Sequence, residues 1–311
     1  MDFQTKFSPF AGLTFINCFS AVMAHIEGWD VNEAFFWFDT MCGRSALRCR
    51  CDGAPSEWQK RICEHDFYDG GTAENIGFLF GLVGYEYSTI TDQQLFRAAI
   101  ADSLSRMRPV IAKVREDGFR VIVDMEDEIP VCPDFSDAQA AQDAACEWDR
   151  LECLYVIGDK AEPKHHLSDG IARIVHVLQE SIEDEFWNGF RREIADGAFC
   201  AEKMHRLADA MWHTFNCHNL AEVFRARHFD GLSDQRLDAV CEGIDQVCRS
   251  THDLAWALIE LDRCTDWNAP ASRYFAGMVD LTLEQMRKND ALLFGYAYEA
   301  AIISGRQIEL R

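Results

Sequence analysis

The sequence predicts an α+β domain followed by an all-α domain. Three observations favour this order: helical apolar periodicity early in the chain, short β-branched runs within 109–157, and a return to helical periodicity from Ser168 onward. The chain has 311 residues, of which 48% are hydrophobic, so it can bury more core than one average domain holds. We therefore expect two domains, residues 1–165 and 166–311, joined near 159–166, where proline and charge interrupt the pattern.

The first helix is predicted within residues 15–29, FINCFSAVMAHIEGW. Asn17 is the expected N-cap, and Gly28 lies just past the expected end. Cys18 and Val22 then share one helical face. A thiol at the positive end of a helix dipole has a lowered pKa and becomes a nucleophile, but free cysteine is equally a small apolar residue that fills cores. Both interpretations of Cys18 remain open at this point.

Two further helices are predicted from their capping signals. Asp30 is followed three residues later by a glutamate, the spacing of a capping box, and opens an aromatic helix to about Met41. Thr91 and Gln94 mark the start of the next helix, which Pro109 stops.

The periodicity then changes to that of strands. Residues 109–114 and 119–123 are β-branched runs on either side of the turn 115–118, the pattern of a β-hairpin. Two more strands are expected at 129–132 and 153–157. A small, mostly antiparallel sheet follows from this order.

The C-terminal half has helical periodicity almost throughout. Apolar residues recur along one face of two predicted helices: Ile171, Ile174, Val175, Leu178 and Ile182 in the first, and Leu237, Val240, Cys241, Ile244, Val247 and Cys248 in the second. A final helix is expected at about 272–289, followed by an apolar stretch at 291–303.

Charge and cysteine content limit the classes of partner and compartment. A formal net charge of −22 argues against nucleic acid and anionic membrane surfaces, because both would repel the chain. The 13 cysteines are odd in number and scattered, and the first ten residues do not have the pattern of a signal peptide. We expect a cytoplasmic protein with no membrane span; a monomer and a homodimer are both compatible with the sequence.

Several stretches resemble one family of acyltransferase-like proteins. They are NCFSAVMAHIEGWDVNEAFFW, GFLFGLVGYEY, RPVIAKV with FRVIVDMED, and CLYVIGDK. In this order they resemble the butirosin biosynthesis protein H family, which has a papain-like N-terminal domain and a helical C-terminal extension. The resemblance covers the first half of the chain by motif order and the second half by helical character. It implies cysteine-dependent acyl transfer, or amide or thioester hydrolysis, on a small-molecule or acyl-carrier-linked substrate.

The resemblance also assigns candidate catalytic residues. Cys18 matches the nucleophile position, Asp134 matches the residue that orients the catalytic histidine, and Asn17 adjoins the nucleophile. The family's histidine belongs on a central strand, where this chain has Phe119 or Arg120. The sequence has no histidine between His65 and His165.

Two interpretations follow from the missing histidine. A histidine from elsewhere, namely His65, His165 or His166, reaches Cys18 in space, or the domain has lost catalysis and keeps a binding function for a small molecule or a peptide. Whether the protein is an enzyme is therefore open, and a histidine beside the Cys18 sulfur would decide for the enzyme.

No metal or cofactor is expected. His213 and Cys217 are spaced i, i+4 and supply only two ligands, and the pairs Cys49/Cys51 and Cys63/His65 lack the usual zinc spacing. The glycine-rich stretch has neither nucleotide-binding fingerprint. Three aromatic clusters either fill cores or line an acyl-chain pocket: Phe35–Phe38, Phe78–Phe80 and Phe294–Tyr298.

Overall fold

The computed structural model is mixed helix and antiparallel sheet, consistent with the α+β class. It describes residues 14–42, 73–115, 118–133, 143–145, 147–183, 186–195, 201–214, 235–269 and 273–305. The chain divides into two compact units. Unit 1 comprises Met1–Phe38 and Arg61–His166, and unit 2 comprises Asp39–Lys60 and Leu167–Arg311.

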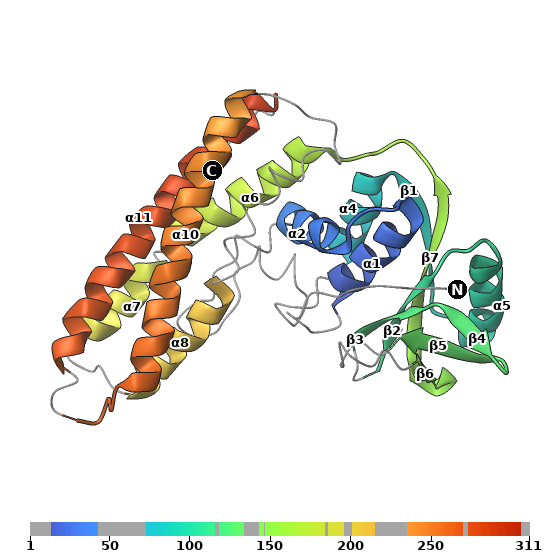
Figure 1. Cartoon of the computed structure of the whole chain (residues 1–311), viewed down its shortest axis with the longest axis horizontal. Helices are drawn as coiled ribbons and strands as arrows, with labels where there is room; N and C mark the ends of the chain where they lie inside the picture. Colours follow the sequence, from blue (N-terminus) through green and yellow to red (C-terminus); the bar gives the residue numbers. More distant parts are fainter. Residues whose placement is uncertain are drawn as a thin grey trace. The chain divides into compact units, whose positions relative to one another are not determined.

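Unit 1 combines helices with two antiparallel sheets (Figure 1). Its helices are α1 (Phe15–Glu27), α2 (Val31–Met41, which runs across the division), α4 (Ala73–Val83) and α5 (Gln93–Ser105), with a 3-10 turn at Trp148–Arg150. Its strands are β1 (Tyr85–Ile90), β2 (Val110–Val114), β3 (Gly118–Ile122), β4 (Asp124–Glu126), β5 (Ile129–Pro133), β6 (Asp143–Ala145) and β7 (Leu151–Lys160). The larger sheet has the order β1-β7-β2-β3, and the smaller one the order β4-β5-β6.

Helix α1 begins one turn earlier than the sequence predicts. Thr14 is the N-cap, and its hydroxyl accepts a hydrogen bond from the Asn17 amide at 3.2 Å, so the expectation that Asn17 caps the helix is wrong. The first amides of a helix have no acceptor within the helix, and the Thr14 hydroxyl supplies one to the amide of Asn17. At the other end, the expectation for Gly28 is confirmed, since it has a φ of 72° and donates to Ala24.

The other two capping signals lie at or beside the predicted residues. Asp30 accepts hydrogen bonds from the amides of Asn32 and Glu33 at 2.9 and 3.0 Å, which confirms the start of α2. Helix α5 is capped by Asp92, whose carboxylate accepts from the Gln94 amide, and not by the neighbouring Thr91. A carboxylate is at least as good a cap as a hydroxyl, so the shift costs nothing.

The two faces of the larger sheet bear different helices. The hairpin of β2 and β3 pairs Val114 with Gly118, as predicted, and side chains then alternate between the faces. Phe119 contacts Phe15 of α1, so odd positions of β3 face α1. Even positions such as Ile122 pack with Phe96 of α5. The sheet therefore lies between α1 and α5 (Figure 1).

Strand β1 was not predicted. Its sequence, YEYSTI, is exposed over most of its length and has no apolar alternation. It becomes a strand because it pairs along β7, from Tyr85 opposite Lys160 to Ile90 opposite Leu154. Strands β5 and β7 were expected, although β7 is longer than its apolar centre indicates.

Unit 2 is helical throughout the part that the structure describes. Its helices are α6 (Leu167–Glu183), α7 (Phe186–Ala195), α8 (Ala201–Thr214), α10 (Gln235–Cys264) and α11 (Arg273–Ile303). The two long helices α10 and α11 run side by side (Figure 1). None of the described helices is both long and apolar enough to cross a bilayer.

Helix α11 is one continuous helix, which corrects the prediction of a helix ending near 289. Asn289 is 2% exposed, and its amide donates to the hydroxyls of Ser250 and Thr251 on α10 at 3.1 and 3.0 Å. The polar pair Asn289-Asp290 is therefore satisfied inside the bundle and does not end the helix.

Candidate functional site

Cys18 lies in the core of unit 1. Its side chain is 0% exposed, and every residue of Phe15–Ala24 is buried. The Cys18 amide donates to the Thr14 carbonyl at 3.1 Å, the first hydrogen bond of the helix. The sulfur is thus closed to solvent, and this amide is engaged rather than available to an oxyanion.

Phe119 is one of the two strand residues, with Arg120, that stand where the family resemblance expects a histidine. It is 1% exposed, and its ring meets that of Phe15 edge to face with centroids 5.3 Å apart. Tyr155 of β7 packs on the same Phe15 ring, also at 5.3 Å. The surface of the sheet toward α1 is therefore aromatic at this point.

His165 packs against α4. Its ring lies 4.8 Å from that of Phe78, and its amide donates to the Gly81 carbonyl. A side chain at Gly81 would meet His165 Cδ2 at 2.6 Å, so the glycine permits this close approach. The other candidates, His65 and Asp134, lie outside the described residues, while Asn17 is buried in the first turn of α1.

Two of the three aromatic clusters fill the core of unit 1. Phe19 of α1 contacts Phe38 at 4.9 Å and Phe80 at 5.0 Å, and Phe80 stacks on Tyr87. In unit 2, Phe294 and Tyr298 stack one turn apart on α11. These contacts favour core packing over an acyl-chain pocket.

The described residues contain no group of three or more side chains able to hold a metal ion. The other candidate ligands, namely Cys49, Cys51, Cys63, Cys217 and the side chain of His213, lie outside the described residues.

A cluster of ionisable groups joins α1 to β1 and β7. The Tyr85 hydroxyl donates to Glu27 Oε1 at 2.5 Å, and Lys160 Nζ donates to both Glu27 oxygens at 2.7 and 2.9 Å. Burial, followed by the bond to Glu27, raises the pKa of Tyr85 to about 12. Burial alone would raise the pKa of Glu27, but the bonds from Lys160 and Tyr85 outweigh it and lower that pKa. A tyrosine held this firmly protonated is a structural group and not a base.

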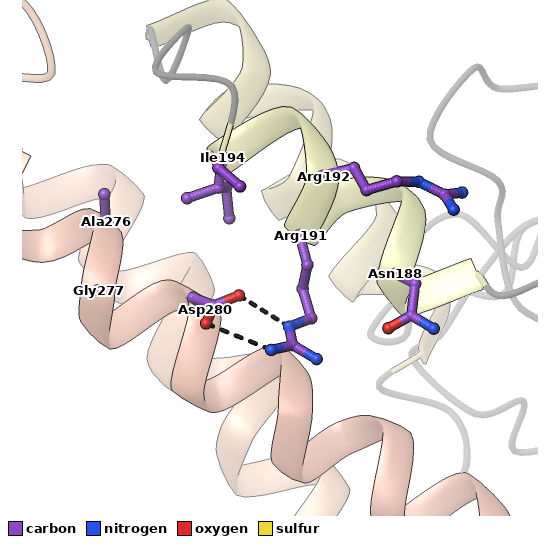
Figure 2. Close-up of a pocket in the computed structure, with 8 residues that line it drawn as sticks. Asn188, Arg191, Arg192, Ile194, Ala276, Gly277 and Asp280 are labelled. Atoms are coloured by element: carbon purple, nitrogen blue, oxygen red, sulfur yellow. Dashed lines mark hydrogen bonds and ion pairs between the residues drawn. The ribbon is translucent and has the colours of Figure 1, made fainter.

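An open pocket of about 580 Å³ lies between α7 and α11 in unit 2. Figure 2 shows Arg191 reaching from α7 toward Asp280 on α11, whereas Arg192 extends away from that pair. The lining residues are Asn188, Arg191, Arg192, Ile194, Ala195, Ala276, Gly277 and Asp280. The pocket thus has a polar part and a small apolar part.

Arg191 is held in place by two carboxylates. Its Nε donates to Asp280 Oδ1 at 2.7 Å, and its Nη1 donates to Glu284 Oε2 at 2.5 Å. The bond to Asp280 raises the pKa of Arg191. Hydrogen bonds from Arg287, with the nearby charges of Arg287, Arg191 and Lys288, lower the pKa of Glu284 to about 2. The guanidinium is therefore fixed at the pocket in its charged form.

No pattern in the sequence predicts this pocket. Arg191 and Asp280 are 89 residues apart, so no spacing signal links them. The pairs of Glu284 with Arg287 and with Lys288, each about one helical turn apart, have spacings that the sequence shows.

No family model matches the chain, and no curated protein matches it in sequence.

Proposed function

We propose that the protein is a non-catalytic binding protein for a small molecule, in which a papain-like unit has lost its cysteine chemistry. The observation that carries this proposal is the complete burial of Cys18. A nucleophilic thiol must reach a carbonyl carbon, and a sulfur with 0% exposure inside a helix packed on all sides does not.

The scaffold supports the papain-like part of the proposal. A cysteine-bearing N-terminal helix packs on a mostly antiparallel sheet whose strands follow it in the chain. Helix α1 lies against β2 and β3, and the family resemblance places the catalytic histidine on the segment that contains β3. The resemblance to the butirosin biosynthesis protein H family suggests the same architecture, followed by a helical unit.

The catalytic part of the resemblance lacks support at two further points. The strand position that the resemblance assigns to the general base, whose contribution is typically about 10²- to 10⁴-fold in rate, holds Phe119 or Arg120, and Phe119 is buried. The Cys18 amide is used within the helix. Acyl transfer would need an exposed thiolate, a base and an oxyanion donor, and each of these functions is weakened here.

The binding part of the proposal rests on the pocket between α7 and α11. Its volume of about 580 Å³ lies in the range of small-molecule sites. It combines polar groups with an apolar wall, as ligand sites do.

Thiol labelling tests the proposal. The native protein is treated with iodoacetamide at pH 7, digested, and mapped by mass spectrometry, with a second sample labelled after unfolding. The exposed Cys264 is the internal control. We expect Cys264 to react in the native protein and Cys18 to react only after unfolding. Selective labelling of Cys18 in the native protein at or below pH 7, lost in Cys18→Ala, would instead support the cysteine acyltransferase.

A further inference from the structure

We propose that the exposed face of α11 is a dimer interface, on which the same helix of a second copy of this chain packs antiparallel. This inference goes beyond the proposed binding function and does not depend on it. Three features of the face carry it: its apolar residues, their spacing along the helix, and the way its charged residues match under a twofold axis.

One face of α11 is exposed although it is rich in apolar residues. With its other side the helix packs against α6, α7 and α10 (Figure 1). Positions 274, 278, 281, 285, 288, 292, 295, 299 and 302 are all exposed, and we call them the outer stripe. Five of the ten exposed large hydrophobic residues in the described part of the chain lie on it: Tyr274, Met278, Leu281, Leu292 and Ile302. Exposed apolar residues that are scattered singly are normal, whereas a contiguous row of them marks an interaction site.

The spacing of the outer stripe predicts that its partner is a helix. Its positions follow one another in alternating steps of four and three, which is the a/d spacing of a heptad repeat, and they span four heptads from 274 to 302. Such a seam packs its side chains into the holes of a facing helix. At a rise of about 1.5 Å per residue the stripe is roughly 40 Å long. Met278 and Leu281 are 57% and 71% exposed, so the chain itself leaves the seam open there.

The charge of the outer stripe favours a second copy as that helix. Lys288 and Glu299 are the charged residues among its nine positions, so the stripe has no net charge. The whole chain has a formal net charge of −22, and two copies repel each other over most of their surfaces. They meet less repulsion on a neutral apolar face, and a twofold axis lets one face serve both copies.

One antiparallel register matches large residues with each other or with small ones. When Leu281 lies opposite Leu292 of the second copy, position 278 lies opposite position 295, because opposed positions have a constant sum in an antiparallel pair. Met278 then faces Gly295, where a Cβ would have no atom of its own chain within 4 Å. The twofold axis repeats each of these contacts, so four apolar layers form.

The same register places opposite charges together at its centre. Lys288 lies opposite Gln285 of the second copy and beside Glu284 of that copy. Within its own chain the Lys288 ammonium is 3.7 Å from Glu284, which is longer than a hydrogen bond, so it keeps donors for the second copy. A polar layer inside an apolar seam fixes its register. A parallel pair would instead set Lys288 against Lys288 and Glu299 against Glu299, which like-charge repulsion disfavours.

Size-exclusion chromatography with light scattering tests the interface on the full chain over a range of concentrations. We expect a particle of twice the chain mass of 35.5 kDa. Leu281→Glu sets a carboxylate against Leu292 at two symmetric places, and a roughly tenfold loss at each should raise the dissociation constant at least about a hundredfold. Leu95→Glu is the control, because it changes an exposed leucine of α5 and should leave the dimer intact. Circular dichroism checks that both variants are folded.

Disulfide cross-linking tests the antiparallel register. The chain with both Leu281→Cys and Leu292→Cys should form a covalent dimer on mild oxidation, seen by non-reducing electrophoresis. Each single substitution should give only the background of the native chain, which has its own exposed Cys264. In a parallel pair either single substitution would cross-link.

Three results would overturn the inference. The first is a monomer at every concentration, and the second is a dimer that Leu281→Glu weakens no more than Leu95→Glu does. The third is cross-linking by a single cysteine substitution above the native background, which would exclude the antiparallel register.

Discussion

Phe119 on strand β3 meets Phe15 on helix α1 edge to face, with ring centroids 5.3 Å apart and an interplanar angle of 82°. Edge-to-face pairs of this kind are favourable beyond the area they bury. Phe15 lies three residues before Cys18 in the same buried helix. This contact between helix and sheet is part of the hydrophobic core of unit 1.

Phe119→His should destabilise the protein by about 3 kcal/mol. The change removes a buried ring contact and places a polar ring in an apolar site. Phe119→Leu, which keeps the position apolar, should cost about half as much. Urea denaturation followed by circular dichroism measures both. A histidine variant as stable as the native chain would show that a polar group near position 119 can form a hydrogen bond with the imidazole.

The contribution of Tyr85 to the free energy of unfolding should be lost as the pH rises from 10 to 12. Its pKa is raised from 10.0 to about 12 in the folded state, so in this interval the folded protein binds the proton more tightly than the unfolded chain does. The stabilisation is complete below pH 10 and is lost as the pH approaches 12. Denaturation at several pH values should show native protein and Tyr85→Phe differing by about 1–2 kcal/mol at pH 8 and converging near pH 12.

The exposed Tyr274 supplies the control for that experiment. Tyr274→Phe should follow the native curve at every pH. A constant gap between the native protein and Tyr85→Phe would contradict the bond to Glu27.

Substitution of glycine by alanine should change the stability of the protein in opposite directions on α11 and α10. Gly277 and Gly295 lie within α11 with open space above them, so Gly→Ala at either position should stabilise the protein by about 0.5–1 kcal/mol. Gly243 on α10 lies under the ring of Tyr296, which a Cβ would overlap. Gly243→Ala should therefore destabilise the protein despite its better helix propensity. Thermal unfolding of the three variants checks the sign, and stabilisation at Gly243 would refute the packing of α10 on α11.

Trp187→Phe should cost about 2–3 kcal/mol. The indole of Trp187 donates to Asp290 Oδ2 at 2.7 Å, and Asp290 is 1% exposed, so the change removes a donor from a buried carboxylate. Trp256→Phe, at an exposed position, should change the free energy of unfolding by less than about 0.5 kcal/mol. If Trp187→Phe costs only as much as this control, the buried hydrogen bond contributes little.

Local signals predicted the elements of unit 1 well where capping chemistry or alternation was strong. Gly28, Asp30 and the β2–β3 hairpin lie where the sequence places them, because each depends on residues within a few positions. The sequence prediction put the N-cap of α1 at Asn17 instead of Thr14, because both are good cap residues. The choice between them depends on tertiary packing. Strand β1 was missed because its partner, β7, lies about 70 positions away.

The sequence by itself determined the succession of helices, small sheet and helices, because periodicity is a property of local order. Tertiary structure decided the rest. The Asn17-Cys18 pair lies within the first turn of a helix whether or not the sulfur faces solvent, and only the packing of α1 against the sheet placed Cys18 in the core. Likewise the Arg191–Asp280 pair and its pocket exist because two helices distant in the chain pack together, a relationship that no local spacing encodes.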